Sequence, residues 1–257
     1  MAKIALSNQT ILITGATSGL GRAMALALAP RGNRLIVTGR RAELLATLAS
    51  EIEALGSRCL TAPVDATDEG AVAAHLTDAI GKLGRIDVAI LNAGGGTALR
   101  LGTERASAVA VKESMARNYD TLVNYLVPLL DYMQSVGGTI AYTCSPAGSF
   151  GLPKSGPYSA AKAAGRVLFD TARIELGHTP IRFVALYPGF TYTEGLVESE
   201  IPFKFLIIEK ERAVRQMLRA IERGTAHAMF PKRIAWPVRI GALIPEPIRR
   251  WFLRQVS

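Results

Sequence analysis

Cysteine, histidine and long apolar runs are all scarce in this chain of 257 residues. Its two cysteines, Cys59 and Cys144, belong to no metal-ligand spacing, so we expect no metal site and a reducing, cytoplasmic setting. Cys144 has no suitably placed histidine partner and is expected to be a buried strand-end residue rather than a nucleophile. No run approaches about 18 uninterrupted apolar residues, so no transmembrane helix is predicted. The first residues lead almost directly into an expected strand and leave no room for a signal peptide.

Linkers, low-complexity stretches and short-period repeats are also missing. The chain is long enough to bury a substantial core, and 49% apolar residues with 24 glycines are typical of a globular protein. We therefore expect one domain over residues 1–257.

The net charge of +9 is unevenly distributed along the chain. Residues 1–203 hold 18 basic and 17 acidic side chains, whereas residues 204–257 hold 12 basic and 4 acidic ones. Basicity is thus a property of the C-terminal part alone. Because no recognised nucleic-acid motif accompanies it, nucleic acid is not an expected partner.

Short β-prone apolar runs alternate with longer helical patterns. This alternation predicts βαβ units and an α/β fold, a Rossmann-like, doubly wound parallel sheet with helices on both faces. Strands are expected over residues 10–14, 34–38, 58–63, 86–91, 138–144 and 181–187, with 226–230 as a last candidate. Helices are expected over residues 22–29, 42–55, 68–82, 106–133, 157–177 and 209–223, the third capped by Asp68.

Most of the residues that could carry chemistry follow expected strands. They include the glycine loop after the first strand, Arg40, Asp65, Asn92, Ser145 and Pro188. Parallel sheets bind ligands beyond the carboxyl ends of their strands, so these residues are expected at one site.

The glycine loop reads Gly15-Ala-Thr-Ser-Gly19-Leu-Gly21 and lies between the first strand and a helix. Gly15 permits a tight turn, Gly19 lets backbone approach a pyrophosphate, and Gly21 allows close helix packing. The helix N-terminus then meets the phosphate charge. A simple turn is the alternative interpretation, but the position after the first strand favours nucleotide binding.

Tyr158 and Lys162 lie four residues apart near the start of an expected helix, which Ser155 or Gly156 can cap. An ammonium and the positive helix end would stabilise a phenolate and lower the pKa of Tyr158, making it a general acid/base. Taken alone, the pair could equally be a partly exposed aromatic beside a solvated lysine.

The motifs together resemble the short-chain dehydrogenase/reductase family over about residues 9–193. The resemblance rests on the following features: the G-x-x-x-G-x-G spacing with Thr14 before it, Asn92-Ala93-Gly94, Ser145 thirteen positions before Tyr158, the Tyr158/Lys162 pair, and Pro188-Gly189 with Thr193.

The resemblance implies a role for each of four residues. Ser145 would hydrogen-bond the substrate oxygen, and Tyr158 would give or take the proton there. Lys162 would hold the nicotinamide ribose and lower the pKa of Tyr158. Asn118 would anchor a water that links Lys162 to solvent; its alternative is a helix asparagine that bonds backbone. Thr121 stands where the family often has a glycine.

The end of the second strand indicates which cofactor is bound. Gly39 occupies the place where an acidic residue would accept the ribose hydroxyls of NAD, and Arg40 and Arg41 follow. A guanidinium can pair with the 2′-phosphate, so NADP(H) is predicted rather than NAD. The alternative is that both arginines merely solvate a helix start.

Further cofactor contacts are implied by the resemblance alone. These would come from Thr14, Gly15, Ser18, Gly19, Leu20, Gly21, Asp65, Ala66, Asn92, Ala93, Gly94, Pro188, Gly189, Thr191 and Thr193.

The last part of the chain loses the regular alternation. Residues 194–223 are expected to form the family's variable substrate lid, whose apolar side chains suit an apolar substrate. Residues 231–257 form a basic-aromatic C-terminal extension, similar to family members near the 11-beta-hydroxysteroid dehydrogenases and reductases of lipid-like carbonyls. It could pack on its own subunit, on a partner subunit or on an anionic bilayer.

The sequence thus predicts an oxidoreductase that transfers a hydride between NADP(H) and the hydroxyl/carbonyl group of a small apolar substrate. A steroid, a keto-lipid or a 3-oxoacyl compound would fit, and the family implies a homodimer or homotetramer. Two alternatives stay open: a non-catalytic nucleotide-binding regulator, and a membrane-associated scaffold of the same fold.

Overall fold

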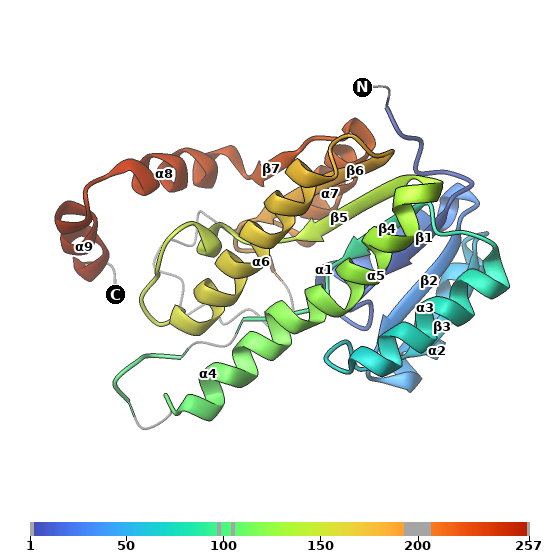
Figure 1. Cartoon of the computed structure of the whole chain (residues 1–257), viewed down its shortest axis with the longest axis horizontal. Coiled ribbons are helices and arrows are strands. Elements are labelled where there is room, and N and C mark those ends of the chain that lie inside the picture. Colours follow the sequence, from blue (N-terminus) through green and yellow to red (C-terminus); the bar gives the residue numbers. More distant parts are fainter. Residues whose placement is uncertain (1–2, 97–98, 104–105, 193–206, 256–257) are drawn as a thin grey trace.

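A seven-stranded sheet, parallel throughout, organises the chain in the computed structural model (Figure 1). The structure describes residues 3–96, 99–103, 106–192 and 207–255. The strands are β1 (Thr10–Ile13), β2 (Arg34–Gly39), β3 (Arg58–Pro63), β4 (Val88–Leu91), β5 (Gly138–Thr143), β6 (Ile181–Pro188) and β7 (His227–Phe230). The six firmly predicted strands and the last candidate are all present, with ends shifted by a residue or two.

The strand order is β3-β2-β1-β4-β5-β6-β7. The chain moves outward from β1 to β3, then returns to the other side of β1 through β4. The reversal lies at β1 and β4, and doubly wound sheets bind ligands beyond the carboxyl ends of the strands at such a point. The predicted fold class is confirmed.

Helices cover both faces of the sheet. On one face, α1 (Gly19–Leu28), α2 (Ala42–Ala54) and α7 (Lys210–Arg223) share a core with alternate residues of the strands, such as Ile11, Ile13 and Leu35. On the other face, α3 (Glu69–Leu83), α5 (Thr121–Val136) and α6 (Gly156–Glu175) pack on the intervening residues, such as Leu12 and Ile36. Because both faces are covered, the strands are almost continuously apolar.

Of two local expectations, the structure confirms one and corrects the other. Asp68 caps α3 by accepting a hydrogen bond from the Ala71 amide at 2.9 Å, as predicted. The single helix expected over residues 106–133 is instead α4 (Ala108–Met115), a π-helical turn (Ala116–Asp120) and α5. Such turns widen a helix locally and are frequent at functional sites.

Beyond β7, the chain continues as α8 (Lys232–Leu243) and α9 (Glu246–Gln255), which extend away from the sheet at the red end of Figure 1. Within the described residues, no helix combines the length and the apolarity needed to cross a bilayer.

Candidate active site

The glycine loop joins β1 to α1 through a tight turn that requires glycine. Gly15 and Gly19 have positive φ angles of 66° and 56°, which side chains other than glycine rarely adopt. A Cβ on Gly15 would lie 2.8 Å from Ala93 Cα, and one on Gly21 would overlap the Gly15 carbonyl. The first turn of α1 holds no acidic residue, and Ser18 makes no capping hydrogen bond. This cradle and the positive helix end fit a phosphate.

Thr14 fastens the glycine loop to the end of β4. Its Oγ1 accepts hydrogen bonds from the backbone amides of Asn92 and Ala93, both at 2.9 Å. In return, the Asn92 Nδ2 donates to the Thr14 carbonyl at 3.3 Å. The two strand ends at the reversal point are thereby held as one unit.

Asn118 lies in the π-helical turn and is fully buried. Its Oδ1 accepts from the Gly95 amide at 2.9 Å, while its Nδ2 donates to the Gly95 carbonyl at 3.0 Å and to the Ser114 carbonyl at 3.1 Å. Gly94 has a φ of 141°, and a Cβ there would lie 2.8 Å from Asn118 Oδ1 and 3.5 Å from Lys162 Nζ. Asn118 and Lys162 therefore flank the same glycine.

Lys162 is a buried cation with a side chain only 3% exposed. Its Nζ donates to the Thr143 carbonyl at 3.0 Å and lies 5.2 Å from the centroid of the Tyr142 ring and 5.9 Å from that of Tyr158. An ammonium has three donors, and Thr143 is its one hydrogen-bond partner in the described parts of the chain. Burial lowers the pKa of Lys162 to about 8. The group is thus still mainly charged at neutral pH and can donate to a ligand.

Ser145 and Tyr158 meet at the carboxyl end of β5. Ser145 precedes the short 3-10 helix Pro146–Ser149, and its Oγ accepts from the Ala147 amide at 3.2 Å. Tyr158 is half-buried in the first turn of α6, for which Ser155 is the N-cap without a side-chain hydrogen bond. Burial raises the pKa of Tyr158, and a side-chain hydrogen bond with Ser145 partly offsets the rise.

The direction of this pKa shift differs from the sequence-based expectation. We predicted that Lys162 lowers the pKa of Tyr158, but the desolvation of the phenol outweighs every favourable contact in the protein alone. The Lys162 Nζ lies 5.9 Å from the centroid of the Tyr158 ring, and its hydrogen bond goes to the Thr143 carbonyl instead. A bound ligand that bridges the two groups would have to supply the lowering.

The sequence matches a known protein family over most of its length. A family model described as short chain dehydrogenase matches residues 9–201. The chain belongs to the short-chain dehydrogenase family. Members of this family are oxidoreductases that use a nicotinamide cofactor on CH–OH and C=O groups, and the glycine cradle, the α1 N-terminus and the buried Lys162 ammonium fit such a cofactor.

Relatives of this short-chain dehydrogenase are found in distant organisms. It is 34% identical over 246 residues to an uncharacterized oxidoreductase of Myxococcus xanthus, covering 95% of each chain. It is 33% identical over 193 residues to dehydrogenase/reductase SDR family member 7B of Bos taurus, covering 72% of this chain and 59% of that one. A solved short-chain type dehydrogenase/reductase from Mycobacterium marinum is 26% identical with a TM-score of 0.78, covering 87% and 94%.

The end of β2 in this short-chain dehydrogenase presents two exposed arginines. Arg41 Nη2 donates to Thr17 Oγ1 in the glycine loop at 2.8 Å, and a Cβ on Gly39 would lie 2.7 Å from Thr17 Cγ2. Arg40 faces Asp65 across the strand ends. Asp65 accepts hydrogen bonds from the Thr67 backbone and hydroxyl, and these, with the charge of Arg40, lower its pKa.

The remaining predicted cofactor residues occupy the same rim, except for one outside the described residues. Leu20 packs partly on the core, and the Ala66 carbonyl accepts from Asn124 Nδ2 at 3.0 Å. Pro188 ends β6, the Gly189 amide donates to the Phe230 carbonyl at 2.8 Å, and Thr191 pairs with Ile208. Thr193 and the lid residues up to 206 lie outside the described residues. The later part of the expected lid, α7, packs on α1 and belongs to the core.

Sequence reasoning missed the glycines that seat α6 on β5. A Cβ on Gly148 would lie 2.9 Å from the Lys162 carbonyl carbon, and one on Gly165 would lie 2.5 Å from the Tyr142 hydroxyl. A glycine inside a helix, such as Gly165, is a signal for close packing that the sequence does offer. The Thr143 carbonyl, in contrast, leaves no trace in the sequence because any residue has one.

Cys144 is buried between these elements, as expected. Its thiol donates to the Lys162 carbonyl at 3.6 Å, and burial raises its pKa. A protonated, enclosed thiol is a poor nucleophile.

Proposed function

We propose that this enzyme transfers a hydride between NADP(H) and the hydroxyl/carbonyl group of a small apolar substrate, with Tyr158 exchanging the proton. The observation that carries the proposal is the arrangement of Ser145, Tyr158 and the buried Lys162 ammonium at the carboxyl ends of β5 and β4. All three can reach one bound molecule.

Ser145 and Tyr158 have different roles at the substrate oxygen. When bound, the nicotinamide supplies or accepts the hydride at the neighbouring carbon. In the reducing direction, Ser145 donates a hydrogen bond that polarises the carbonyl, and Tyr158 gives its phenolic proton to the oxygen. In the oxidising direction, Tyr158 takes that proton back. Ser145 already acts on the Tyr158 hydroxyl by lowering its pKa, which supports this pairing.

Lys162 acts through its charge and its remaining donors. One N–H is fixed on the Thr143 carbonyl, so the ammonium is oriented before any ligand arrives. The others would hold the ribose hydroxyls of the cofactor. A positive charge there stabilises the phenolate that forms after proton transfer. Asn118 acts as a positioning residue that fixes Gly95 and so holds the neighbouring Gly94 beside this ammonium.

The preference for NADP(H) rests on Arg40 and Arg41. Both side chains are exposed at the end of β2, which has Gly39 in place of an acidic residue, and Arg41 donates a hydrogen bond to Thr17 in the glycine loop. A 2′-phosphate would gain charge-assisted hydrogen bonds there. The contacts of Thr14, Gly15, Ser18, Gly19, Leu20, Gly21, Asp65, Ala66, Asn92, Ala93, Gly94, Pro188, Gly189, Thr191 and Thr193 complete the proposed cofactor site.

The substrate class and the assembly follow from exposed apolar residues. Phe190 and Tyr192 are exposed directly after Gly189 and favour an apolar substrate such as a steroid, keto-lipid or 3-oxoacyl compound. Val127 on α5 and Val167 and Ile174 on α6 are also exposed. Contact between these helices in two copies would bury them and give the homodimer or homotetramer that the family implies.

A hydride-transfer assay tests the proposal. NADPH oxidation is followed with a panel of ketones for the native enzyme, Tyr158→Phe and the control Tyr132→Phe, which removes a hydroxyl on α5. We expect Tyr158→Phe to lose roughly a hundredfold to ten-thousandfold in turnover while still binding NADPH, and the control to stay active. Equal activity of native enzyme and Tyr158→Phe would overturn the mechanism. NADPH binding without oxidation of any substrate would favour a regulatory protein.

A further inference from the structure

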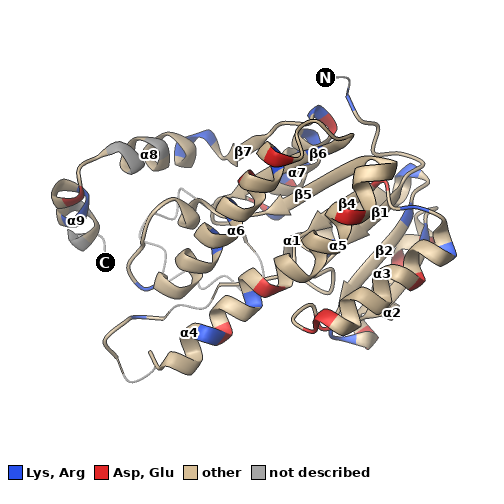
Figure 2. Ribbon diagram, in the orientation of Figure 1, with Lys and Arg blue, Asp and Glu red and all other residues tan. Residues whose placement is uncertain are grey.

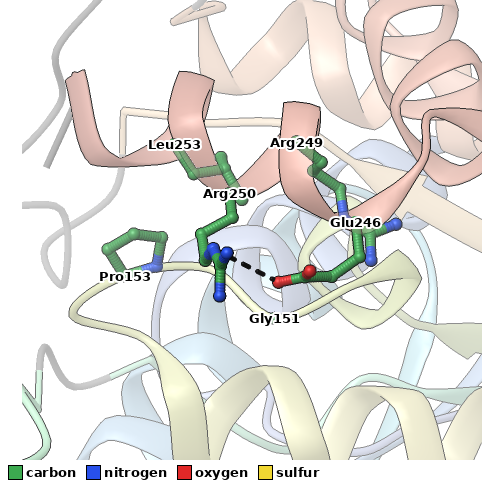
Figure 3. A pocket seen from close by; sticks show the side chains of 6 residues that line it. All are labelled: Gly151, Pro153, Glu246, Arg249, Arg250 and Leu253. Carbon is green, nitrogen blue, oxygen red and sulfur yellow. Dashed lines mark ion pairs between the residues drawn. The ribbon is translucent and has the colours of Figure 1, made fainter.

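Helix α9 is exposed on both sides, but the side that borders the rest of the protein is the charged one and the apolar side faces solvent. Glu246, Arg249, Arg250 and Leu253 line a pocket of about 350 Å³ against Gly151 and Pro153, as Figure 3 shows. These four residues recur at helical spacing and share one face. Ile248 and Trp251 lie on the opposite face and are 59% and 64% exposed. A surface helix of a globular protein normally has the reverse arrangement.

Helix α8 also exposes apolar side chains on the side away from the protein. Ile234, Ala235 and Gly241 are buried on one side, whereas Trp236 and Ile240, one turn apart, are 65% and 52% exposed. We refer to the face formed by Trp236, Ile240, Ile248 and Trp251 as the outer apolar face. It contains both tryptophans of the chain.

The segment that carries this face is basic. Residues 232–257 hold six basic side chains and one acidic side chain, a difference of +5. Figure 2 shows basic positions at the start of α8 and on α9. The one acidic residue, Glu246, pairs with Arg250 within α9. Exposed tryptophan and isoleucine beside arginine and lysine is the composition of a helix that lies in the interface of an anionic bilayer.

The net charge of this segment also distinguishes between two possible partners of the outer apolar face, a second copy of the chain and a lipid surface. In a symmetric dimer, the same patch meets itself, so two segments of +5 would face each other. Like charges across an interface oppose such an arrangement. An anionic lipid surface instead attracts the net positive charge of the segment while the two tryptophans enter the headgroup region.

We propose that α8 and α9 form a docking surface for anionic lipid bilayers. The surface is joined to the segments that border the active site. Arg233 Nη2 donates to the Ile207 carbonyl at 3.0 Å, and the Arg249 guanidinium lies 5.6 Å from the centroid of the Phe150 ring, in the segment after Ser145. Ile234 packs so closely on Gly189 that a Cβ there would overlap it. Docking therefore holds the substrate side of the enzyme next to the bilayer.

The two native tryptophans provide the test. The full chain is titrated with vesicles of phosphatidylcholine alone and of phosphatidylcholine with phosphatidylglycerol, and tryptophan emission and co-sedimentation are recorded. We expect a blue shift and sedimentation with the anionic vesicles only. Trp236→Phe and Trp251→Phe, measured separately, should each retain the shift, which assigns contact to both helices.

A matched pair of variants locates the contact. Ile240→Ser/Ile248→Ser keeps both fluorescent probes and should weaken binding to anionic vesicles at least about tenfold. Leu55→Ser/Val109→Ser removes exposed apolar side chains from other helices and should bind like the native chain. Circular dichroism verifies that all variants are folded. Three results would each overturn the proposal: no shift with anionic vesicles, equal binding by both double variants, or a shift that depends on protein concentration without vesicles, which assigns the face to a second copy.

Discussion

Asn118 binds both backbone polar groups of Gly95. The Oδ1 accepts from the Gly95 amide at 2.9 Å and the Nδ2 donates to the Gly95 carbonyl at 3.0 Å. Gly95 lies outside the helices and strands, so this one side chain provides the hydrogen bonds that regular secondary structure would otherwise give its backbone. The loop after β4 is thereby fixed to the turn between α4 and α5. The backbone-bonding alternative for Asn118 describes this arrangement better than a water anchor does, and it makes the residue a support for the floor of the cofactor site.

Replacing Asn118 with alanine should weaken both the fold and cofactor binding. Three hydrogen bonds are lost from a buried side chain, while Gly95 itself can turn to water. We expect a loss of roughly 2 kcal/mol in the free energy of unfolding, measured by urea denaturation, and a weaker Kd for NADPH. Thr77→Ala removes a hydroxyl that bonds only its own helix and should change neither quantity. An unchanged Kd in Asn118→Ala would contradict the supporting role.

The buried ammonium of Lys162 should lower the stability of the cofactor-free enzyme. Its pKa is about 8 when folded and about 10.4 when unfolded, so the folded state binds fewer protons between these values. The penalty is complete below the folded pKa and fades as pH rises through this window. Relative to Lys162→Met, the native protein should gain about 2 kcal/mol between about pH 7.5 and about pH 9.5. Parallel pH curves for the two proteins would refute a buried charge.

Arg40 and Arg41 should determine the choice between the two nicotinamide dinucleotides. In Arg40→Ala/Arg41→Ala the 2′-phosphate loses its cations, so we expect the Kd for NADPH to rise roughly tenfold to a hundredfold. The Kd for NADH should change little. Arg58→Ala removes an exposed arginine from the opposite end of the neighbouring strand and serves as the control. An equal loss for both dinucleotides would indicate a general structural effect instead.

Gly94 should tolerate no side chain, whereas a helix glycine elsewhere should accept one. Gly94→Ala forces an unfavourable φ of 141° and sets a Cβ against Asn118 Oδ1, so a loss of roughly 1–3 kcal/mol and weaker NADPH binding are expected. Gly81 in α3 has open space around its Cα, and Gly81→Ala should stabilise the protein by about 0.5–1 kcal/mol. Thermal unfolding of the two variants in parallel measures the contrast, and similar shifts would contradict it.

The sequence was most informative where side-chain chemistry repeats along the chain. Alternating apolar runs predicted every strand, and the motif spacing brought Ser145, Tyr158, Lys162 and Asn118 to one region, where the structure also has them. Backbone groups and desolvation could not be predicted in this way. The Thr143 carbonyl that orients Lys162 can belong to any residue, and the raised pKa of Tyr158 depends on burial that only packing creates.

The orientation of the C-terminal extension likewise could not be predicted from the sequence. Its composition indicated an amphipathic segment, but which side would face outward depends on the position of each residue relative to the loop at Gly151 and Pro153. Helical spacing alone gives two faces without saying which one the protein covers. Only the fold reveals that the charged face of α9, and not the apolar one, borders this loop.

Because α6 packs closely on β5, the chemistry of the reaction and the choice of substrate can evolve separately. Thr143, Ser145, Tyr158 and Lys162 lie within 20 consecutive residues, and Gly148 and Gly165 let α6 pack closely on β5 and on the short helix that follows it. Mutations after Gly189 can therefore reshape what the enzyme accepts while the proton-transfer groups keep their mutual distances. Such a chain can acquire new substrates one loop substitution at a time.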